Sequence, residues 1–389
     1  MHVLIIPSWY PRFKGDNFGG FFREQAIALK RSGVDVGVIY PNIKSMKKFI
    51  PGRNKPYNTF FYKDHDVIIF QCDSYNWIPR HQKLSTALWS FLGMILFKKY
   101  IKKHGLPDVI HVQSMLNGCL LAKNIKAKFN IPFIVTEHSS SFIRQRHTDK
   151  ITNWALSLTK NASYRLAVSK SQVEYLAGKS TDLTWKFLPN IVNQTFLDSS
   201  IGQIKGYNFI HIASLDRNKG TALLIDAFAS RFKGRQGVTL TICGDGPEKA
   251  NIQSQIKGHG IGRQVHLRGQ LSREQILQEM RIASSLVVAS YYETFSIACI
   301  EALAVGIPVV ATKCGGPESI ITPKNGLLVA KGCRAALADG MTAIFDNKEK
   351  FDPEKIKQEC KKTFGEVAII SKLKAIMQRS IDENTSREV

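Results

Sequence analysis

The chain has 389 residues, of which 44% are hydrophobic and 22% are charged, and this composition excludes collagen-like, wholly disordered and disulfide-scaffold proteins. The formal net charge of +23 favours an anionic partner: a phosphorylated substrate, an anionic membrane or a nucleic acid. A merely soluble basic protein is the competing interpretation. Seven scattered cysteines without a CxxC pair indicate a reduced, cytoplasmic chain with no metal site.

The first 200 residues alternate short apolar runs with helical patterns, which is typical of parallel sheets with helices on both faces. Met1 leads directly into the first such run, so we expect no signal peptide. The longest apolar run, 84–97, is too short for the roughly 20 residues of a membrane-spanning helix. Strands are expected at 3–7, 34–40, 67–70, 109–112, 133–136 and 166–168, and helices at 21–32, 84–103, 118–128 and 171–177.

The alternation lapses between Pro189 and Tyr207 and then begins again, so we place a domain boundary there. The predicted domains are residues 1–200 and 205–365. In the second, strands are expected at 209–213, 238–243, 265–267, 285–288 and 309–311, and helices at 221–232, 248–257, 273–282, 296–305 and 334–345. A last helix is expected at 367–379, followed by a polar tail. The predicted fold class is α/β, with two doubly wound domains that bind ligands at the carboxyl ends of their strands.

Two loops of the first half carry candidate binding residues. Gly19 and Gly20, in the loop Gly15–Gly20, precede a helix, so the backbone can approach an anion there, although a flexible loop ending at a helix cap is equally compatible. The cluster of Glu137, His138 and Ser139 follows a strand and can bind sugar hydroxyls, with His138 stabilising charge or assisting proton transfer. The alternative is that His138 only hydrogen-bonds within its loop.

The loop after the first strand of the second half contains two cations. Lys219 is well placed to neutralise a diphosphate and Arg217 to help it, unless both are solvated surface cations. A later turn, Gly244-Asp245-Gly246-Pro247, has the composition of a structural turn in which Asp245 caps the next helix.

The segment from Glu293 to Glu301 begins just after a strand and runs into an apolar helix. The amides of Phe295, Ser296 and Ile297 lie at the start of that helix, which is a favourable place for a phosphate. The two glutamates are eight residues apart, or about 12 Å along an ideal helix. This separation suits two groups of one extended ligand, and ribose hydroxyls would satisfy a Glu301 that lies beside the core. Two ordinary glutamates flanking a helix have the same spacing.

Together these segments resemble a known family. ASLDRNKG, ICGDGPE, VHLRG, ASYYETFSIACIEALAVGIPVVAT and GGPESII are similar to the nucleotide-binding half of retaining GT4-type glycosyltransferases, and SWYP, PDVIHVQ and TEHSS are similar to its acceptor half. The resemblance covers about residues 1–330. It implies a GT-B fold: two Rossmann-like domains facing a central cleft, with a last helix, 367–380, packing back on the first. It also implies metal-independent, retaining transfer from a nucleotide-sugar, with no cofactor.

The resemblance also implies roles for single residues. Glu293 and His138 would be catalytic, near the reacting sugar, and Glu301 would bind the donor ribose. The family often has an arginine five residues before the lysine, where this chain has Ser214. Either Arg217 or another cation compensates, or the diphosphate is held more loosely. The diphosphate would be held by Lys219, by the amides of Phe295, Ser296 and Ile297, and by Gly20. Arg268 would lie in the base-contacting loop, and Trp9, Tyr10 and Ser139 would contact the acceptor.

Two stretches mix cations with apolar side chains, residues 44–63 and 84–103. They suit an anionic membrane surface, but they also suit nucleic acid, or a core helix beside a solvated loop. We expect a peripheral enzyme on the inner face of the cytoplasmic membrane that extends a polyprenyl-diphosphate-linked glycan of a bacterial surface polysaccharide. UDP is the favoured donor nucleotide, with GDP as the competitor. The alternatives are a soluble transferase acting on a small metabolite, a sugar-nucleotide epimerase, and a non-catalytic nucleic-acid-binding protein.

Overall fold

The computed structural model describes residues 1–11, 19–50, 55–203 and 205–386. They divide into two compact units, each a parallel sheet between layers of helices. The predicted fold class, two Rossmann-like α/β domains, is confirmed. Unit 1 comprises Met1–Val168, Gln172–Leu188 and Ile369–Val389, and unit 2 comprises Ser169–Ser171 and Pro189–Ala368.

The sheet of unit 1 has eight strands in the order β3-β4-β2-β1-β5-β6-β7-β8. All neighbours are parallel except β3, which pairs antiparallel with β4 at the edge. Central strands such as β1 and β5 are apolar because helices cover both of their faces. The strands are β1 (His2–Pro7), β2 (Asp35–Ser45), β3 (Tyr57–Asp64), β4 (Val67–Asn76), β5 (Val109–Gln113), β6 (Phe133–Glu137), β7 (Tyr164–Ala167) and β8 (Lys186–Phe187).

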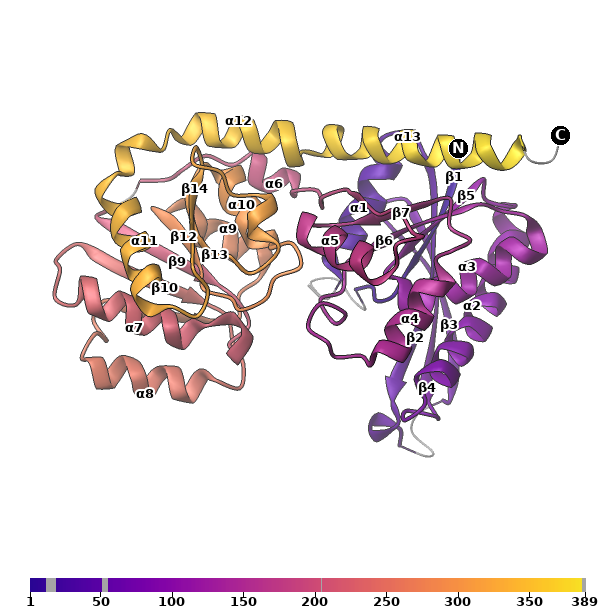
Figure 1. Cartoon of the computed structure of the whole chain (residues 1–389), viewed down its shortest axis with the longest axis horizontal. Helices are drawn as coiled ribbons and strands as arrows, with labels where there is room; N and C mark the ends of the chain where they lie inside the picture. The colour runs from indigo at the N-terminus through magenta and orange to yellow at the C-terminus, as the bar shows by residue number, and fades with distance from the viewer. Residues whose placement is uncertain (12–18, 51–54, 204, 387–389) are drawn as a thin grey trace. The chain divides into compact units, whose positions relative to one another are not determined.

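Helices α2, α3 and α4 pack together against one face of this sheet, and their buried side chains form one core with β1 and β5 (Figure 1). Helix α2 follows the expected run 84–103 and contributes Trp89, Leu96 and Phe97 to that core. Within the described ranges, no helix is long and apolar enough to cross a membrane. The helices are α1 (Gly20–Arg31), α2 (Gln82–His104), α3 (Met115–Phe129), α4 (Asp149–Leu158) and α5 (Lys170–Lys179), with a short 3₁₀ turn at Met46–Lys48.

The last helix, α13 (Glu366–Thr385), belongs to unit 1 from Ile369 onward. Lys374 Nζ donates to Ser32 O at 2.9 Å, and Asn384 Nδ2 donates to Asn130 O at 2.9 Å. The yellow helix in Figure 1 therefore lies along the unit that carries the N-terminus. It is longer than expected, because the polar segment after residue 380 stays helical as far as Thr385.

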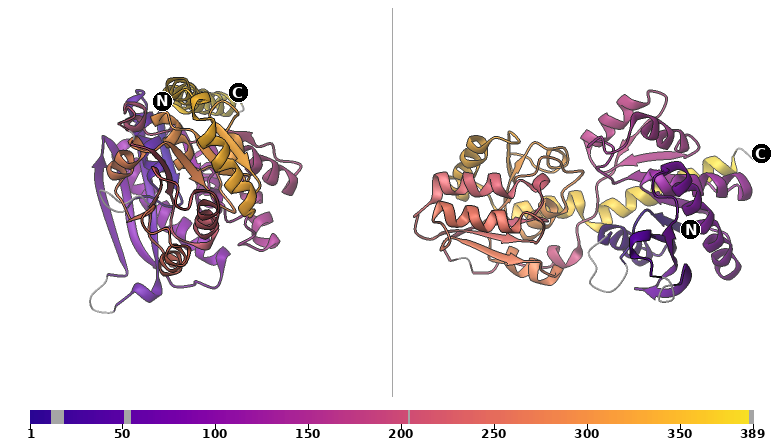
Figure 2. Two further views of the ribbon diagram at one scale, coloured as in Figure 1. Left: turned by 90° about the vertical axis from the view of Figure 1, so that its left-hand side faces the viewer. Right: turned by 90° about the horizontal axis from the view of Figure 1, so that it is seen from below.

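The sheet of unit 2 has six parallel strands in the order β11-β10-β9-β12-β13-β14. Helices α7, α8 and α11 form a core with one face, while α9, α10 and α12 group on the other (Figures 1 and 2). The strands are β9 (Tyr207–Ile212), β10 (Val238–Cys243), β11 (Val265–Gly269), β12 (Ser285–Val288), β13 (Val309–Thr312) and β14 (Gly326–Val329). The helices are α6 (Gln194–Leu197), α7 (Thr221–Phe232), α8 (Lys249–His259), α9 (Arg273–Arg281), α10 (Ile297–Val305), α11 (Arg334–Asp346) and α12 (Pro353–Phe364), with 3₁₀ turns at Arg217–Lys219, Pro317–Ser319 and Lys348–Lys350.

Several elements were missed by the sequence analysis: β3, β8, β14, α4, α6 and α12. Strand β3 is mostly exposed, so it lacks the apolar run of a central strand. Helix α12 is mostly polar, and its start signal, Asp352 as N-cap followed by Pro353, was not used. Strand β3 lies at the margin of its sheet, whereas α12 buries Ile356, Cys360 and Phe364 at every fourth position, a helical pattern that the sequence does show.

Candidate active site

In unit 2, three loops meet where the adjacent parallel strands β9, β12 and β13 end. The backbone of Glu293, after β12, is bonded to the loop after β13: its N–H donates to Cys314 O at 2.9 Å, and Gly316 N donates to its carbonyl at 2.8 Å. A Cβ at Gly316 would lie 2.4 Å from Phe295 O, so only glycine permits this approach. The loop after β13 therefore fixes the backbone position of Glu293.

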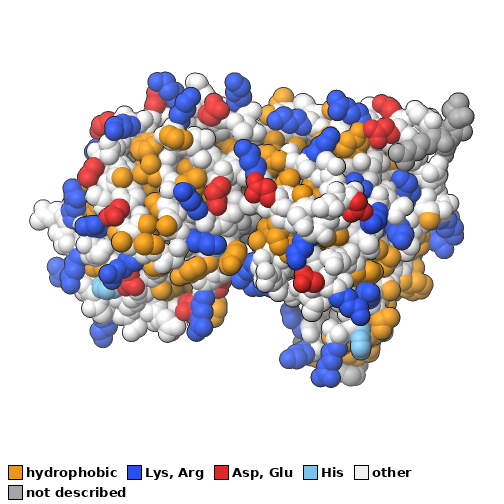
Figure 3. Space-filling model, viewed as in Figure 1, with side chains coloured by type: hydrophobic (Ala, Val, Ile, Leu, Met, Phe, Trp, Pro, Cys, Tyr) orange, Lys and Arg blue, Asp and Glu red, His pale blue; other side chains and the backbone are white. Residues whose placement is uncertain are grey.

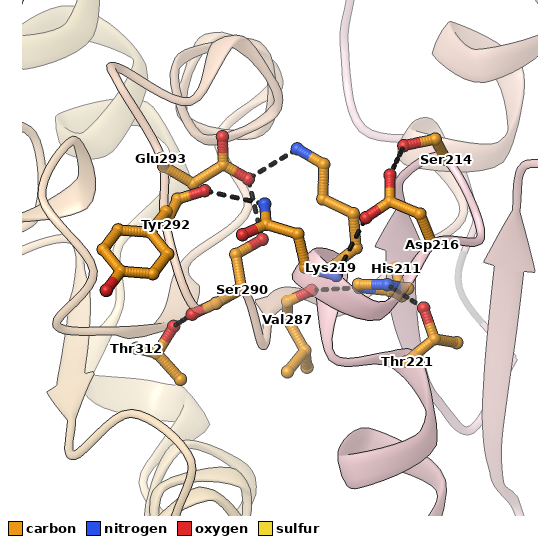
Figure 4. Close-up of polar contacts among 11 residues, drawn as sticks. His211, Ser214, Asp216, Lys219, Thr221, Val287, Ser290, Tyr292, Glu293 and Thr312 are labelled. Carbon is orange, nitrogen blue, oxygen red and sulfur yellow. Dashed lines mark hydrogen bonds and ion pairs between the residues drawn. The ribbon is translucent and has the colours of Figure 1, made fainter. Parts of the chain in front are cut away.

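The Glu293 carboxylate pairs with Lys219, which comes from the loop after β9 (Figure 4). Lys219 Nζ and Glu293 Oε1 are 2.8 Å apart, and Ser290 Oγ donates to the same oxygen at 2.7 Å. Their side chains are 25% and 15% exposed. Burial lowers the pKa of Lys219, but the charge and hydrogen bond of Glu293 outweigh it, so that the pKa is raised and the ammonium is kept. The structure thus brings together two of the predicted donor-site residues, 74 positions apart.

The Lys219 loop is itself held by short polar contacts (Figure 4). Asp216 accepts from Asn218 N at 2.9 Å and from Ser214 Oγ at 2.7 Å, and Asn218 Nδ2 donates to Tyr292 O at 3.0 Å. Ser214, where the family often has arginine, therefore shapes the turn. The supporting side chains Asn218 and Ser290 were not found from the sequence, because neither forms a recognisable motif.

His211, at the end of β9, lies buried beneath this loop (Figure 4). One ring nitrogen lies 2.8 Å from Val287 O and the other 3.0 Å from Thr221 Oγ1, so Nδ1 donates to the carbonyl and Nε2 accepts from the hydroxyl. Burial lowers the pKa of His211 to about 4. The ring is therefore neutral at physiological pH and ties β9 to β12 and to the start of α7.

This histidine predicts a pH-dependent stability. Between about pH 6.5 and pH 4, His211 is protonated in the unfolded chain and neutral in the folded chain. The free energy of unfolding therefore carries the full contribution of His211 above pH 6.5 and loses it as the pH falls towards 4. The loss amounts to about 3 kcal/mol across this window. We expect the urea midpoint of unit 2 to fall between pH 7 and pH 4.5, and a His211→Gln variant to lose most of that dependence. An unchanged dependence in the variant would assign it to other groups.

The start of helix α10 carries the other predicted donor contacts. The helix begins at Ile297, after Ser296 with φ 81°, and its first amides have no partner within the helix. Glu301, about one turn into the helix, is 6% exposed and accepts a hydrogen bond from the Arg273 guanidinium. Arg273 is the first residue of α9, and the sequence analysis missed it. The capping pair Ser272 and Gln275, which marks the start of that helix, was the available signal.

The two other predicted arginines are engaged elsewhere. Arg217 is 90% exposed and its Nε lies 3.5 Å from Glu248 Oε1, so it is no part of the Lys219–Glu293 pair. This position does not support the prediction that Arg217 takes the place of the arginine that the family often has. Arg268, on the edge strand β11, pairs with Glu279 of α9 at 3.0 Å and is half-exposed.

In unit 1, His138 follows β6 and is 7% exposed. Its ring stacks on Phe21 with the centroids 5.2 Å apart and meets the edge of Phe22 at 4.8 Å. Neither ring nitrogen has a hydrogen-bond partner among the described residues, so the alternative of a bond within the loop is not realised. Burial holds the pKa of His138 well below its ordinary value. The imidazole is neutral, with one donor and one acceptor nitrogen, and both nitrogens are buried.

Glu137 fixes the loop that carries His138. Its carboxyl group is fully buried and accepts from the backbone N–H groups of Met115, His138 and Ser139 at 2.8, 3.0 and 2.6 Å. Burial raises its pKa to about 7 despite these bonds. Ser139 in turn donates from its hydroxyl to Ser141 Oγ at 2.8 Å. The predicted cluster is thus ordered by one buried acid.

The other residues of unit 1 that are predicted to contact a ligand lie just after β1 and at the start of α1. Gly20 is the first residue of α1, after Gly19 with φ 78°, whereas residues 15–18 of the predicted glycine loop lie outside the described residues. The Trp9 ring packs 5.1 Å from Phe22. Tyr10, which is predicted to contact the acceptor, is 1% exposed, so its side chain is buried in this structure.

Comparisons with known proteins identify the family of this chain. The model described as Glycosyltransferase Family 4 matches residues 21–193, and the model Glycosyl transferases group 1 matches 199–363. The chain is 25% identical over 372 residues to the teichuronic acid biosynthesis glycosyltransferase TuaC of Bacillus subtilis, covering 91% of each. It is 25% identical over 366 residues to a glycogen synthase of Mycobacterium tuberculosis, covering 89% of this chain and 86% of the relative.

Solved structures share the fold. A sucrose-phosphate synthase from Thermosynechococcus elongatus superposes with a TM-score of 0.76 at 18% identity, over 97% of this chain and 99% of the other. Anabaena HepE, solved in complex with UDP, gives 0.72 at 18% identity, over 97% of this chain and 100% of the other. The two family models together span most of the sequence, and the solved structures share its fold. The chain belongs to the GT4-type glycosyltransferases with the GT-B fold.

Proposed function

We propose that this glycosyltransferase moves a sugar from a nucleotide-sugar to a glycan acceptor, with retention of configuration and without a metal ion. The observation that carries the proposal is the Lys219–Glu293 pair beside the start of α10, with Glu301 about one turn into that helix. A cation and a helix start can together neutralise a diphosphate. The carboxylates of Glu293 and Glu301 can then bind the two sugars of the donor, which are the transferred sugar and the ribose.

Each residue has a distinct task in this proposal. Lys219 and the amides of Phe295, Ser296 and Ile297 stabilise the charge that develops on the departing diphosphate. Glu301 accepts hydrogen bonds from the ribose. In this structure Glu293 neutralises Lys219. With donor bound, the diphosphate shares that cation and Glu293 orients the sugar.

The bond between the anomeric carbon and the phosphate oxygen breaks, and the acceptor oxygen bonds to that carbon on the same face. The acceptor proton passes to the departing phosphate oxygen. Glu293 and His138 stabilise the sugar without becoming glycosylated. Intact-mass spectrometry during turnover tests this step. A glycosyl adduct on Glu293 would contradict it and would indicate a double displacement instead.

Thermal unfolding with UDP, GDP and ADP in EDTA tests the donor assignment, with a short DNA duplex as a parallel sample. The relative HepE was solved with UDP, which favours UDP here. A ligand at about 100 times its dissociation constant stabilises the folded protein by about 2.7 kcal/mol. For a unit of this size the expected shift is about 5–10 °C with one nucleoside diphosphate. A shift with DNA and none with nucleotides would contradict the proposal.

We propose a lipid-linked acceptor and a peripheral site on the inner face of the cytoplasmic membrane. Unit 1 exposes Phe61 and Phe91, which are 46% and 64% exposed, and Lys99 and Lys103 lie 5.8 and 5.0 Å from the Phe61 ring centre. Lysine and arginine side chains also gather at the end of this unit where β2 and β4 end (Figure 3). Apolar rings flanked by cations suit anionic lipid head groups, and a polyprenyl-diphosphate-linked glycan of a surface polysaccharide would lie in such a membrane.

Vesicle flotation tests this attachment. We expect binding to vesicles containing phosphatidylglycerol and not to pure phosphatidylcholine, with binding weakened in a Phe61→Ser/Phe91→Ser variant. The control is Ile282→Ser in unit 2, where the side chain is 44% exposed, similar to Phe61. Equal recovery with both vesicle types would favour an acceptor in solution, such as a small metabolite.

A further inference from the structure

We propose that Arg273 is a positioning residue of the donor site, which holds Glu301 ionised and oriented for the ribose hydroxyls. The inference rests on the proposed nucleotide-sugar donor and assigns a residue that no motif contains. It starts from the contact between the Arg273 guanidinium and the Glu301 carboxylate, which joins the first turn of α9 to the middle of α10.

The position of Arg273 is tightly defined by its surroundings. Ser272, just before it, caps α9 by accepting from Gln275 N, while Gln275 Oε1 accepts from Ser272 N at 2.8 Å. The guanidinium carbon lies 5.6 Å from the centre of the Phe196 ring. The arginine is thus held between an aromatic ring and a carboxylate, and its own side chain is 26% exposed.

Glu301 needs such a partner because its side chain is only 8% exposed. A carboxylate removed from water favours its neutral form unless a charge or hydrogen bonds compensate. The guanidinium supplies a permanent charge and fixes one oxygen, Oε1. A carboxylate has about four acceptor positions, enough for a guanidinium and for two neighbouring ribose hydroxyls. Arg273 therefore determines which side of Glu301 the ribose meets.

Arg273 acts on a part of the donor different from that served by Lys219. Lys219 and Glu293 form their own pair, in loops after β9 and β12, whereas Arg273 follows β11. Its removal is therefore expected to affect recognition of the ribose more than that of the diphosphate. A lysine at this position keeps the charge but lacks the planar fork that orients a carboxylate.

The test compares nucleotides with and without the 2′-hydroxyl by calorimetric titration. The probes are UDP and 2′-deoxy-UDP, or the guanosine pair if the wild type binds GDP. We expect the wild type to bind the ribose form about 10-fold more tightly, or more, than the 2′-deoxy form. A hydrogen bond to a charged group accounts for a difference of this size. Arg273→Ala should remove most of this discrimination, and Arg273→Lys should recover it only in part. Adding Arg273→Ala to Glu301→Gln should cost little further affinity, because both act on one contact.

Arg281→Ala serves as the matched control, because Arg281 ends the same helix and its Nε donates to Ser200 O at 2.9 Å. It should retain the wild-type discrimination. Equal weakening of both nucleotides in Arg273→Ala, or full discrimination in a folded Arg273→Lys, would overturn the positioning role. A wild type that binds none of UDP, GDP and ADP would instead contradict the proposed function, and this inference with it.

Discussion

Replacing Glu293 by glutamine is expected to lower kcat about 100- to 1000-fold and to leave the fold intact. The two side chains have the same shape, so Ser290 can still donate to the amide oxygen, but the charge beside the reacting sugar is lost. The rate of nucleoside diphosphate release measures the effect, and the thermal midpoint checks the fold.

Glu248→Gln is the matched control. Glu248 is a partly buried glutamate of the same unit, 24% exposed and paired with Arg217 at 3.5 Å. We expect its kcat to stay within a factor of a few of the wild type. Equal rates for Glu293→Gln and the wild type would place the reacting sugar elsewhere.

Lys219→Ala is expected to have the second large effect, a fall in kcat/KM for the nucleotide-sugar of about 100-fold or more. The variant loses the cation proposed to meet the diphosphate, and it leaves the Glu293 carboxylate, 15% exposed, without its ion-pair partner. Lys219→Arg should restore part of the activity, because the charge returns on a side chain of different shape.

Lys249→Ala controls for the loss of any lysine–carboxylate pair in unit 2. Lys249 Nζ and Asp245 Oδ2 are 2.7 Å apart, but the two side chains are 42% and 43% exposed. An exposed pair contributes little to stability, and this one belongs to the turn after β10. A loss in Lys249→Ala as large as that in Lys219→Ala would show that the effect is not specific to the donor site.

The strand and helix alternation could be predicted because central parallel strands must be apolar on both faces. The buried residues Ile356, Cys360 and Phe364 of α12 repeat every four residues, which is a helical pattern that the sequence does show, whereas the exposed edge strand β3 carries too little burial pattern to be predicted. The extended end of α13 shows the same limit, because contacts with unit 1 keep a polar segment helical.

For the candidate site, the sequence indicated which loops carry the chemistry but not which side chains meet. Lys219 and Glu293 were each placed at a strand end, and parallel topology brings those ends together. Their ion pair depends on side-chain geometry, as does the contact of Arg273 with Glu301. The burial of Tyr10, which is 1% exposed, could not be predicted either, because an aromatic residue beside a loop has the same letter whether buried or not.

The most direct test of the account is sugar transfer itself. The protein would be incubated in EDTA with radiolabelled UDP- and GDP-sugars and a bacterial membrane lipid extract, and label in the lipid phase would be measured. We predict label from one nucleotide-sugar, release of an equal amount of nucleoside diphosphate, an α-linked product from an α-linked donor, and loss of all three in Glu293→Gln. Activity that appears only when a divalent metal is added, or a product of inverted configuration, would contradict the mechanism proposed here. The absence of transfer from every donor, with either the lipid extract or soluble sugars as acceptor, would contradict its central claim.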